Sequence, residues 1–213
     1  IALLVRRVAE RMPDVAVHEG FVDVQQPDAP TALAAVEGPV VVVPLLLSQG
    51  FHVRVDLGRA VAARADAVVT DPLGPDTRLA AVLARRLAEA GPDPAAADPT
   101  APDPATPDRA APVVLAVAGS RDPRSLPDAE DMAALLAARL DREVVPAYLA
   151  ARAPSLAEAT AARPGAVVAT YLLAHGYFFD VTRRNAGSAT VTEPLLDAGE
   201  PPTELIDLII DRY

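Results

Sequence analysis

The segment VVVPLLLSQGFHVRVDL at residues 41–57 returns, with substitutions, as VVATYLLAHGYFFDVTR at residues 167–183. Two further phrases repeat in the same order: VVTDPLGPDTRLAAVLARRL at 68–87 with TVTEPLLDAGEPPTELIDLII at 190–210, and GFVDVQQP at 20–27 with AYLAARAP at 147–154. Self-similarity in a constant order indicates an internal duplication in which each copy is a structural unit. The sequence therefore predicts two related halves.

The two copies differ in the side chains that can do chemistry. In the repeat register His52 is matched by Phe178, and Asp23 is matched by Ala150. The first copy thus keeps an imidazole and a carboxylate where the second copy has apolar groups. We expect one active half and one scaffold half.

Short β-branched runs alternate with amphipathic segments along the chain. In the first copy this pattern predicts a helix opening at Ile1, a short strand near Val15–Val17 continuing towards Phe21–Val24, a helix from Asp28 through Val36, a strand at Val40–Val43 covered on both faces, a helix from about His52 to Arg64, a strand at Ala67–Thr70 and a helix from Asp76 through Ala90. In the second copy it predicts strands at Val113–Ala118, Val144–Tyr148, Val167–Leu172 and Thr190–Thr192, and helices at Asp128–Leu140, Ser155–Arg163, Gly176–Asn185 and Thr203–Arg212. Such alternation implies right-handed crossovers and parallel sheets. The expected fold class is α/β, with two tandem three-layer, Rossmann-like halves, mainly parallel sheets and a cleft between them.

Proline and alanine dominate the segment GPDPAAADPTAPDPATPDRAAP at residues 91–112. It has almost no large apolar residue and no helical period, which is typical of an extended or disordered linker. We therefore predict halves at residues 1–90 and 113–213. The first copy has no counterpart of Val113–Ser125, so the repeat predicts a further strand and loop before Ile1.

Composition excludes several classes of protein. The net charge of −10 argues against nucleic acid as a partner, since phosphate binding calls for a basic face. No apolar run approaches the ~20 residues of a membrane helix. The chain has no cysteine, so it has neither disulfides nor thiolate metal sites, which is compatible with a cytoplasmic protein. All its basic residues are arginine, a bias that matches the abundant alanine and proline of a GC-rich genome.

Asp23 and His52 each follow a predicted strand of the first copy. In open parallel sheets, ligands bind beyond the carboxyl ends of the strands. A carboxylate and an imidazole that face one cleft can hold a divalent metal or move a proton. The same two residues fit a structural reading equally well, with a half-buried histidine near a helix start and a solvated aspartate.

The motif around His52, LLLSQGFHVRVDL at residues 45–57, resembles the signature of the class II tetrapyrrole chelatases, the sirohydrochlorin cobaltochelatase and ferrochelatase family. In that signature a strand ends in Pro-Leu-Leu/Phe-Leu, a glycine turn follows, and a histidine precedes an acidic residue. The matching positions are Pro44–Leu47, Gly50, His52 and Asp56.

Two other motifs carry the same resemblance across the rest of the chain. FVDVQQP resembles the family's Phe-Leu-Glu-Leu-x-x-Pro, with Asp23 in place of glutamate. GSRDPR at residues 119–124 resembles the family's His-Gly-Ser-Arg-Asp-Pro loop, with Ala118 in place of histidine. The resemblance is to the long, two-repeat form of the family.

The resemblance implies insertion of Co²⁺ or Fe²⁺ into sirohydrochlorin, for cobalamin or sirohaem synthesis. His52 and Asp23 become the catalytic residues and the metal ligands, the metal is a substrate, and no cofactor is bound permanently. The second half becomes catalytically degenerate. The family's other histidine falls before Ile1 in the repeat register, so a non-catalytic tetrapyrrole- or metal-binding protein on the same fold is the alternative.

Sirohydrochlorin is a polycarboxylate, so an acidic protein must bind it through a locally basic cleft. Arg54 is the best candidate for this role, although a solvent-facing arginine fits the same position. We assign Gln49, Gly50 and Phe51 of the same turn to substrate binding as well.

The second copy has its own histidine and aromatic residues at the equivalent turn. His175 aligns with Gln49 and reads as a turn or cleft-wall residue. Tyr177, Phe178 and Phe179 fit either core packing or an apolar wall for a macrocycle.

Overall fold

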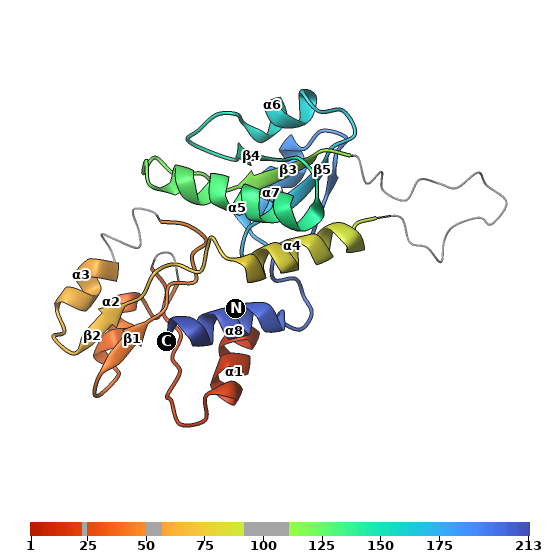
Figure 1. The fold of residues 1–213 in the computed structure, drawn as a ribbon. Helices are drawn as coiled ribbons and strands as arrows, with labels where there is room; N and C mark the ends of the chain where they lie inside the picture. The colour runs from red at the N-terminus through yellow and green to blue at the C-terminus, as the bar shows by residue number, and fades with distance from the viewer. Residues whose placement is uncertain (23–24, 50–56, 92–110) are drawn as a thin grey trace.

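The computed structural model describes residues 1–22, 25–49, 57–91 and 111–213 (Figure 1). The elements of the first copy are α1 (Ala2–Arg11), α2 (Ala29–Ala34), β1 (Val40–Val42), α3 (Gly58–Ala62), β2 (Ala67–Val69) and α4 (Thr77–Glu89). Those of the second copy are β3 (Val113–Val117), α5 (Ser125–Leu140), β4 (Val144–Tyr148), α6 (Leu156–Ala161), β5 (Val167–Tyr171), α7 (Tyr177–Asn185), β6 (Thr190–Val191) and α8 (Thr203–Arg212). The α/β class is confirmed, and every ladder in these two sheets is parallel.

The second half is a three-layer sandwich around a four-stranded sheet in the order β4-β3-β5-β6. Alternate residues of β3 face opposite layers, as the two-residue period of a strand requires. Val113, Leu115 and Val117 join the core under α4 and α5, while Val114 and Ala116 pack with α6. All five residues of β3 are buried, which matches a central parallel strand covered on both faces.

The first half carries a smaller sheet of β1 and β2 only, within the described ranges. The strand predicted near Val15–Val17 is wrong, because those residues form no ladder. The prediction continued towards Phe21–Val24, where Phe21 makes only an isolated bridge to Asp28 and residues 23–24 lie outside the described part. In the second half the equivalent strand β4 pairs with β3. Among the described residues no strand lies beside the segment at Val15–Val17, so its backbone groups form no ladder.

The strand β1 also differs from its prediction. It ends at Val42, and its three residues are half-buried instead of covered on both faces. A two-stranded sheet offers too little surface for complete burial of a strand.

Backbone hydrogen bonds confirm the register of the duplication. The Phe21 N–H donates to the Pro27 carbonyl at 2.9 Å, and the Tyr148 N–H donates to the Pro154 carbonyl at 2.9 Å. The backbone hydrogen bonds just past the end of each strand pair match as well. The Thr70 N–H donates to the Val42 carbonyl, and the Thr192 N–H donates to the Val168 carbonyl, both at 3.0 Å. The two copies therefore follow the same path even where only one of them builds a full sheet.

Helix starts follow the capping residues that the sequence offers. Asp28 caps α2 by accepting the Thr31 N–H at 2.8 Å, and Ser155 caps α6 in a capping box with Glu158. Helix α5 begins at Ser125, earlier than the predicted Asp128. It can do so because Pro127 lies in the first turn, where its missing N–H costs nothing.

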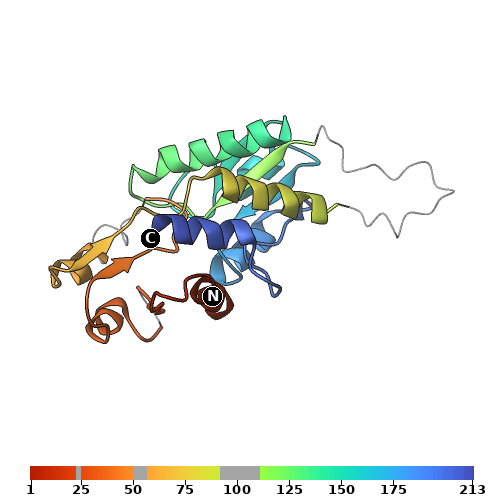
Figure 2. The ribbon, with the colours of Figure 1, turned by 60° about the horizontal axis from the view of Figure 1, so that its bottom comes forward.

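The two halves share one hydrophobic core. Helix α4 of the first copy packs on α5 and β5, and α8 lies between α1 and α4 (Figures 1 and 2). The shared cluster includes Leu4, Val8, Leu79 and Leu83 from the first copy and Leu115, Leu136, Leu205 and Leu208 from the second. The division at residues 91–112 stays a prediction, since residues 92–110 lie outside the described ranges.

Polar contacts also join the two halves. Arg86 of α4 is 9% exposed and donates to the carbonyl of Pro194, and its guanidinium lies 2.8 Å from the Asp197 carboxylate. At the surface Arg7 binds Glu200 through two hydrogen bonds of 2.8 and 2.7 Å. Within the described residues, no helix is long and apolar enough to cross a membrane.

Candidate functional site

Most of the predicted site residues fall in segments that the structure leaves undescribed. Asp23 lies in residues 23–24, and Gly50, Phe51, His52 and Arg54 lie in residues 50–56. Their roles, and the cleft that they were expected to line, stay predictions. Gln49 is described, and it ends the segment that leads from β1 towards His52.

The segment after β1 is held by hydrogen bonds from both halves. The Leu73 N–H of the first half donates to the Leu46 carbonyl at 2.8 Å. The next contacts come from the second half: the Tyr171 hydroxyl donates to the Leu47 carbonyl at 2.9 Å, and the Gln49 N–H donates to Asp128 Oδ2 at 2.5 Å. The described segment Leu47–Gln49 is thus held by side chains of β5 and α5.

Burial shapes the electrostatics of these two side chains. Burial raises the pKa of the Tyr171 phenol well above its usual range, so it remains a neutral donor. Burial also raises the pKa of Asp128, an effect that the hydrogen bond from the Gln49 N–H opposes and the charge of Asp131 reinforces. Both groups lie outside the set predicted from the sequence, because nothing in the repeat marks a contact between the copies.

Gly74 permits the close approach of the two halves at this point. A Cβ at this position would overlap the Tyr171 hydroxyl and lie 2.5 Å from the Leu47 carbonyl oxygen. The contact therefore requires glycine, since any other residue would push the tyrosine and the turn apart.

The second half shows where the two repeat positions fall in a complete sheet. Ala150, which matches Asp23, follows β4, and Phe178, which matches His52, lies in the first turn of α7 after β5. Strands β4 and β5 lie on either side of β3, so both positions follow the carboxyl ends of parallel strands in one sheet. Their counterparts Asp23 and His52 lie outside the described residues.

The loop that resembles the family's His-Gly-Ser-Arg-Asp-Pro motif follows β3 at the same edge. Gly119 has φ of +87°, and a Cβ there would overlap the Ala150 carbonyl oxygen. Arg152 donates to the carbonyls of Ser120 at 2.7 Å and Asp122 at 2.6 Å. The loop is therefore rigidly built, although Ala118 stands where the family has histidine.

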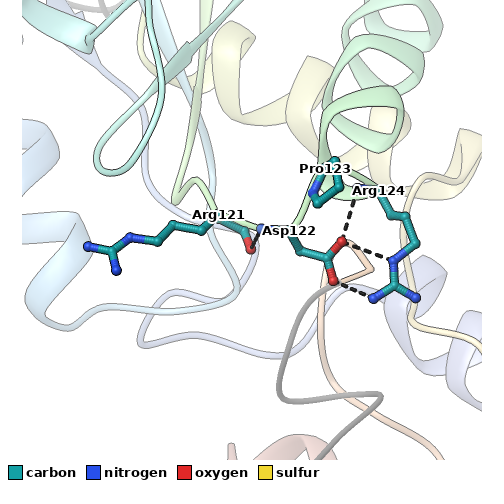
Figure 3. Close-up of a pocket in the computed structure, with 5 residues that line it drawn as sticks. Arg121, Asp122, Pro123 and Arg124 are labelled. Atoms are coloured by element: carbon teal, nitrogen blue, oxygen red, sulfur yellow. Dashed lines mark hydrogen bonds and ion pairs between the residues drawn. The ribbon is translucent and has the colours of Figure 1, made fainter.

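An open pocket of about 640 Å³ is lined by Ser120, Arg121, Asp122, Pro123 and Arg124. Asp122 pairs with Arg124, with Arg124 Nε 2.9 Å from Asp122 Oδ1. Figure 3 shows Arg121 pointing away from this pair. The pair neutralises much of the charge of the loop.

His175 lies in the turn between β5 and α7, as expected, and it has a partner that sequence reasoning missed. Its Nε2 lies 2.6 Å from Glu193 Oε2, and its ring meets Phe179 edge-on with centroids 4.6 Å apart. In the repeat register Glu193 matches Asp71, and His175 matches Gln49. Both positions carry polar residues in each copy, and this could have pointed to a contact between them.

Of the three aromatic residues after His175, only Phe179 lies in the core. Phe179 is buried at 6% exposure, whereas Tyr177 is 72% exposed and Phe178 is 37% exposed. Core packing therefore accounts for Phe179 alone.

Within the described ranges no group of three or more His, Asp and Glu side chains is arranged to hold a metal ion. The predicted ligands Asp23 and His52 lie outside those ranges. The pair of His175 and Glu193 supplies only two donors.

Two duplicated α/β halves with parallel sheets define a chelatase-like class of fold, and comparison with known proteins agrees. A sequence profile described as CbiX matches residues 1–90 and 112–191, in both copies. The chain belongs to the CbiX family. This match confirms the resemblance to the class II tetrapyrrole chelatases.

Two solved structures share the fold. "SirB from Bacillus subtilis with Fe3+" has a TM-score of 0.72 and 21% identity, over 99% of this chain and 85% of that one. A protein from Deinococcus radiodurans, DR2241, described as similar to chelatases with two additional domains, has a TM-score of 0.66 and 18% identity. The match covers 99% of this chain and 50% of DR2241. A comparison with curated protein sequences gave no match.

Family membership supports a tetrapyrrole metal chelatase, a metal-insertion lyase that binds a tetrapyrrole and takes a divalent metal as substrate.

Proposed function

We propose that the protein inserts Co²⁺ or Fe²⁺ into sirohydrochlorin in the cytoplasm, feeding cobalamin or sirohaem synthesis. The observation that carries this proposal is the CbiX match across both copies, together with an asymmetric pair of residues in the matched region. His52 and Asp23 are present in the first copy, and Phe178 and Ala150 replace them in the second.

The chemistry of metal insertion fits this pair of residues. The macrocycle gives up both inner pyrrole protons as the metal enters, so the site needs exchangeable metal ligands and a proton acceptor. An imidazole and a carboxylate bind Co²⁺ and Fe²⁺ without the retention that thiolates give. His52 presents the metal or takes a pyrrole proton, and Asp23 assists coordination or proton removal. A neutral imidazole can do this near pH 7, because the ordinary pKa of histidine is about 6.5.

The peripheral carboxylates of sirohydrochlorin need donors on a protein whose net charge is −10. Arg54 is the proposed cation, and Gln49, Gly50 and Phe51 form the turn beside it. The Gln49 N–H is committed to Asp128, so the backbone of that residue is fixed and its side chain is the part proposed to meet substrate.

Insertion of Co²⁺ into sirohydrochlorin, followed by absorbance, tests the proposal. We expect catalysis above the spontaneous rate, and His52→Ala should lower kcat/KM by about 10²–10⁴-fold, the usual range for a proton-transfer group. His18→Ala is the matched control, because His18 lies exposed in the irregular segment before Phe21. A rate unchanged by His52→Ala would remove the site assignment.

A second candidate is a non-catalytic tetrapyrrole- or metal-binding protein on the same fold. The loop after β3 has Ala118 in place of the family's histidine, so the second half by itself lacks that group under either candidate. This candidate predicts saturable binding of sirohydrochlorin with no insertion above the spontaneous rate.

A further inference from the structure

The loop after β6 is held by an arginine of the first half. Arg86, in α4, donates from Nε to the Pro194 carbonyl at 3.2 Å and from Nη2 to the Leu195 carbonyl at 3.5 Å. Its Nη1 lies 2.8 Å from Asp197 Oδ2 in the same loop, and 2.8 Å from Glu89 Oε2 in its own helix. The guanidinium therefore joins α4 to a loop of the other half.

The loop after β2 is held in the same way by an arginine of the second half. Arg212, at the end of α8, donates from Nε to the Pro72 carbonyl at 3.2 Å. Its Nη2 donates to the Leu73 carbonyl at 3.4 Å. The same two atoms of an arginine thus meet two successive carbonyls in each half.

The two arginines occupy matched positions of the duplication. Each stands nine residues after the threonine that begins its helix, Thr77 in α4 and Thr203 in α8. The loops match as well, since Asp71–Leu73 and Glu193–Leu195 share the order of an acidic residue, proline and leucine. One type of contact is therefore made twice, in opposite directions between the halves.

We infer that Arg86 and Arg212 form a matched pair of bridges that hold the two halves in one fixed arrangement, each by fixing a loop at the carboxyl edge of the opposite sheet. In open parallel sheets, ligands bind beyond this edge. Both loops lie there, because they follow the parallel strands β2 and β6. The inference goes beyond the proposed function and does not depend on it, since every contact joins described residues whatever the ligand is.

Arginine is the side chain that suits this contact. Its planar guanidinium presents Nε and Nη2 along one edge, so it can meet two carbonyls together, whereas lysine offers a single ammonium. The carbonyls need such a donor, because Leu73 and Leu195 are both fully buried at 0% exposure. A buried carbonyl without a partner costs free energy.

Each leucine is held from both halves at once. The Leu73 N–H donates to the Leu46 carbonyl at 2.8 Å, and the Leu195 N–H donates to the Leu172 carbonyl at 3.0 Å, each within one half. The carbonyl of the same leucine accepts from the arginine of the other half. Interfaces between domains usually permit relative motion unless they are large and apolar. Here the shared core and the two bridges together oppose opening of the halves about a hinge.

Three variants of the whole protein test the bridges one at a time. Arg86→Met and Arg212→Met keep most of the length of the side chain and remove its donors. Arg139→Met is the control, because Arg139 is an exposed arginine in the last turn of α5. The measurement is amide hydrogen exchange at Leu73 and Leu195, the matched N–H groups of the two loops.

We expect Arg86→Met to speed exchange at Leu195 by about 10- to 100-fold and to leave Leu73 within about 2-fold of the parent. Arg212→Met should do the opposite, and the control should match the parent at both amides. Unchanged exchange, faster exchange at both amides together, or faster exchange only in the half that carries the substituted arginine overturns the inference. If Arg86→Met does not fold, Asp197→Asn weakens the same bridge from the loop side and is measured in its place.

A second measurement tests whether the bridges fix the arrangement of the halves. The chain has no cysteine, so Arg59→Cys in α3 and Ala157→Cys in α6 place one spin label on an exposed position of each half. We expect a single narrow distribution of distances between the labels in the parent, and a broader one when Arg86→Met and Arg212→Met are combined. A broad distribution in the parent, or the same distribution in the combined variant, overturns the inference.

Discussion

The second half forms a four-stranded sheet and lacks the proposed catalytic pair, whereas the first half keeps that pair and builds only a two-stranded sheet among its described residues. Strand β3 is buried along its whole length, while β1 is half-buried throughout. We expect the half predicted to react to depend for its stability on the other half, because the two share a core and the second half donates or accepts hydrogen bonds at Leu47 and Gln49 of the first.

The largest effect is expected when the side chains at matched positions of the two copies are exchanged. Asp23→Ala should lower Co²⁺ insertion by about 10²–10⁴-fold, because it removes the carboxylate proposed to assist metal binding or proton removal. The reciprocal change, Ala150→Asp, restores an acid in the second copy and should leave the rate near that of the parent, since Phe178 still occupies the histidine position. The measurement is the steady-state rate of insertion by absorbance.

Equal rates for Asp23→Ala and the parent would contradict the assignment of activity to the first copy. A rise in the rate of Ala150→Asp would show instead that the second copy still binds substrate productively.

The strands of the second half were easier to predict from the sequence than those of the first half. Val113–Val117 and the segment ending at Tyr171 were predictable from sequence, because a strand covered on both faces leaves a continuous apolar run. The segment at Val15–Val17 was predicted as a strand as well, yet it pairs with no strand among the described residues. Local pattern therefore predicts the residues that can form a strand, and pairing decides whether they do.

Only part of the candidate site could be predicted from the sequence. The repeat singles out His52 and Asp23, since a comparison of the copies shows which polar residues one copy lacks. It is silent on Asp128 and Tyr171, because a contact between α5 or β5 and the turn after β1 leaves no mark in either copy alone. Contacts of this kind depend on how α4 and α8 join the halves, which only the three-dimensional structure shows.

A second test asks whether the shared core makes the halves unfold together. Leu83 of α4 is fully buried in that core, and Leu83→Ala should cost about 2–5 kcal/mol of unfolding free energy. Val61 of α3 is buried at 8% exposure outside this cluster, and Val61→Ala should cost less, about 1–2 kcal/mol. Urea unfolding followed by circular dichroism and by tyrosine fluorescence measures both values.

Coincident transitions for the two probes, shifted together by Leu83→Ala, would confirm one cooperative unit. Separate transitions would show that the halves are stable without each other, and the dependence of the first half on the second would then be wrong.

The smallest effect concerns an ion pair at the surface between the halves. Arg85 of α4 lies 2.7 Å from Glu204 of α8, and its hydrogen bonds lower the pKa of that carboxyl below its ordinary value of 4.5. A carboxyl with a lowered pKa stabilises the fold fully above pH 4.5, and that contribution is lost as pH falls through the lower folded-state pKa. Because the side chains are 44% and 29% exposed, the pair is worth at most about 1 kcal/mol.

Glu204→Gln should therefore slightly reduce the loss of stability between neutral and acidic pH. Glu130→Gln, a change at an exposed position on α5, is the control. A pH profile of the urea midpoint that is the same for Glu204→Gln and the parent would show that this ion pair contributes nothing measurable to the joining of the halves.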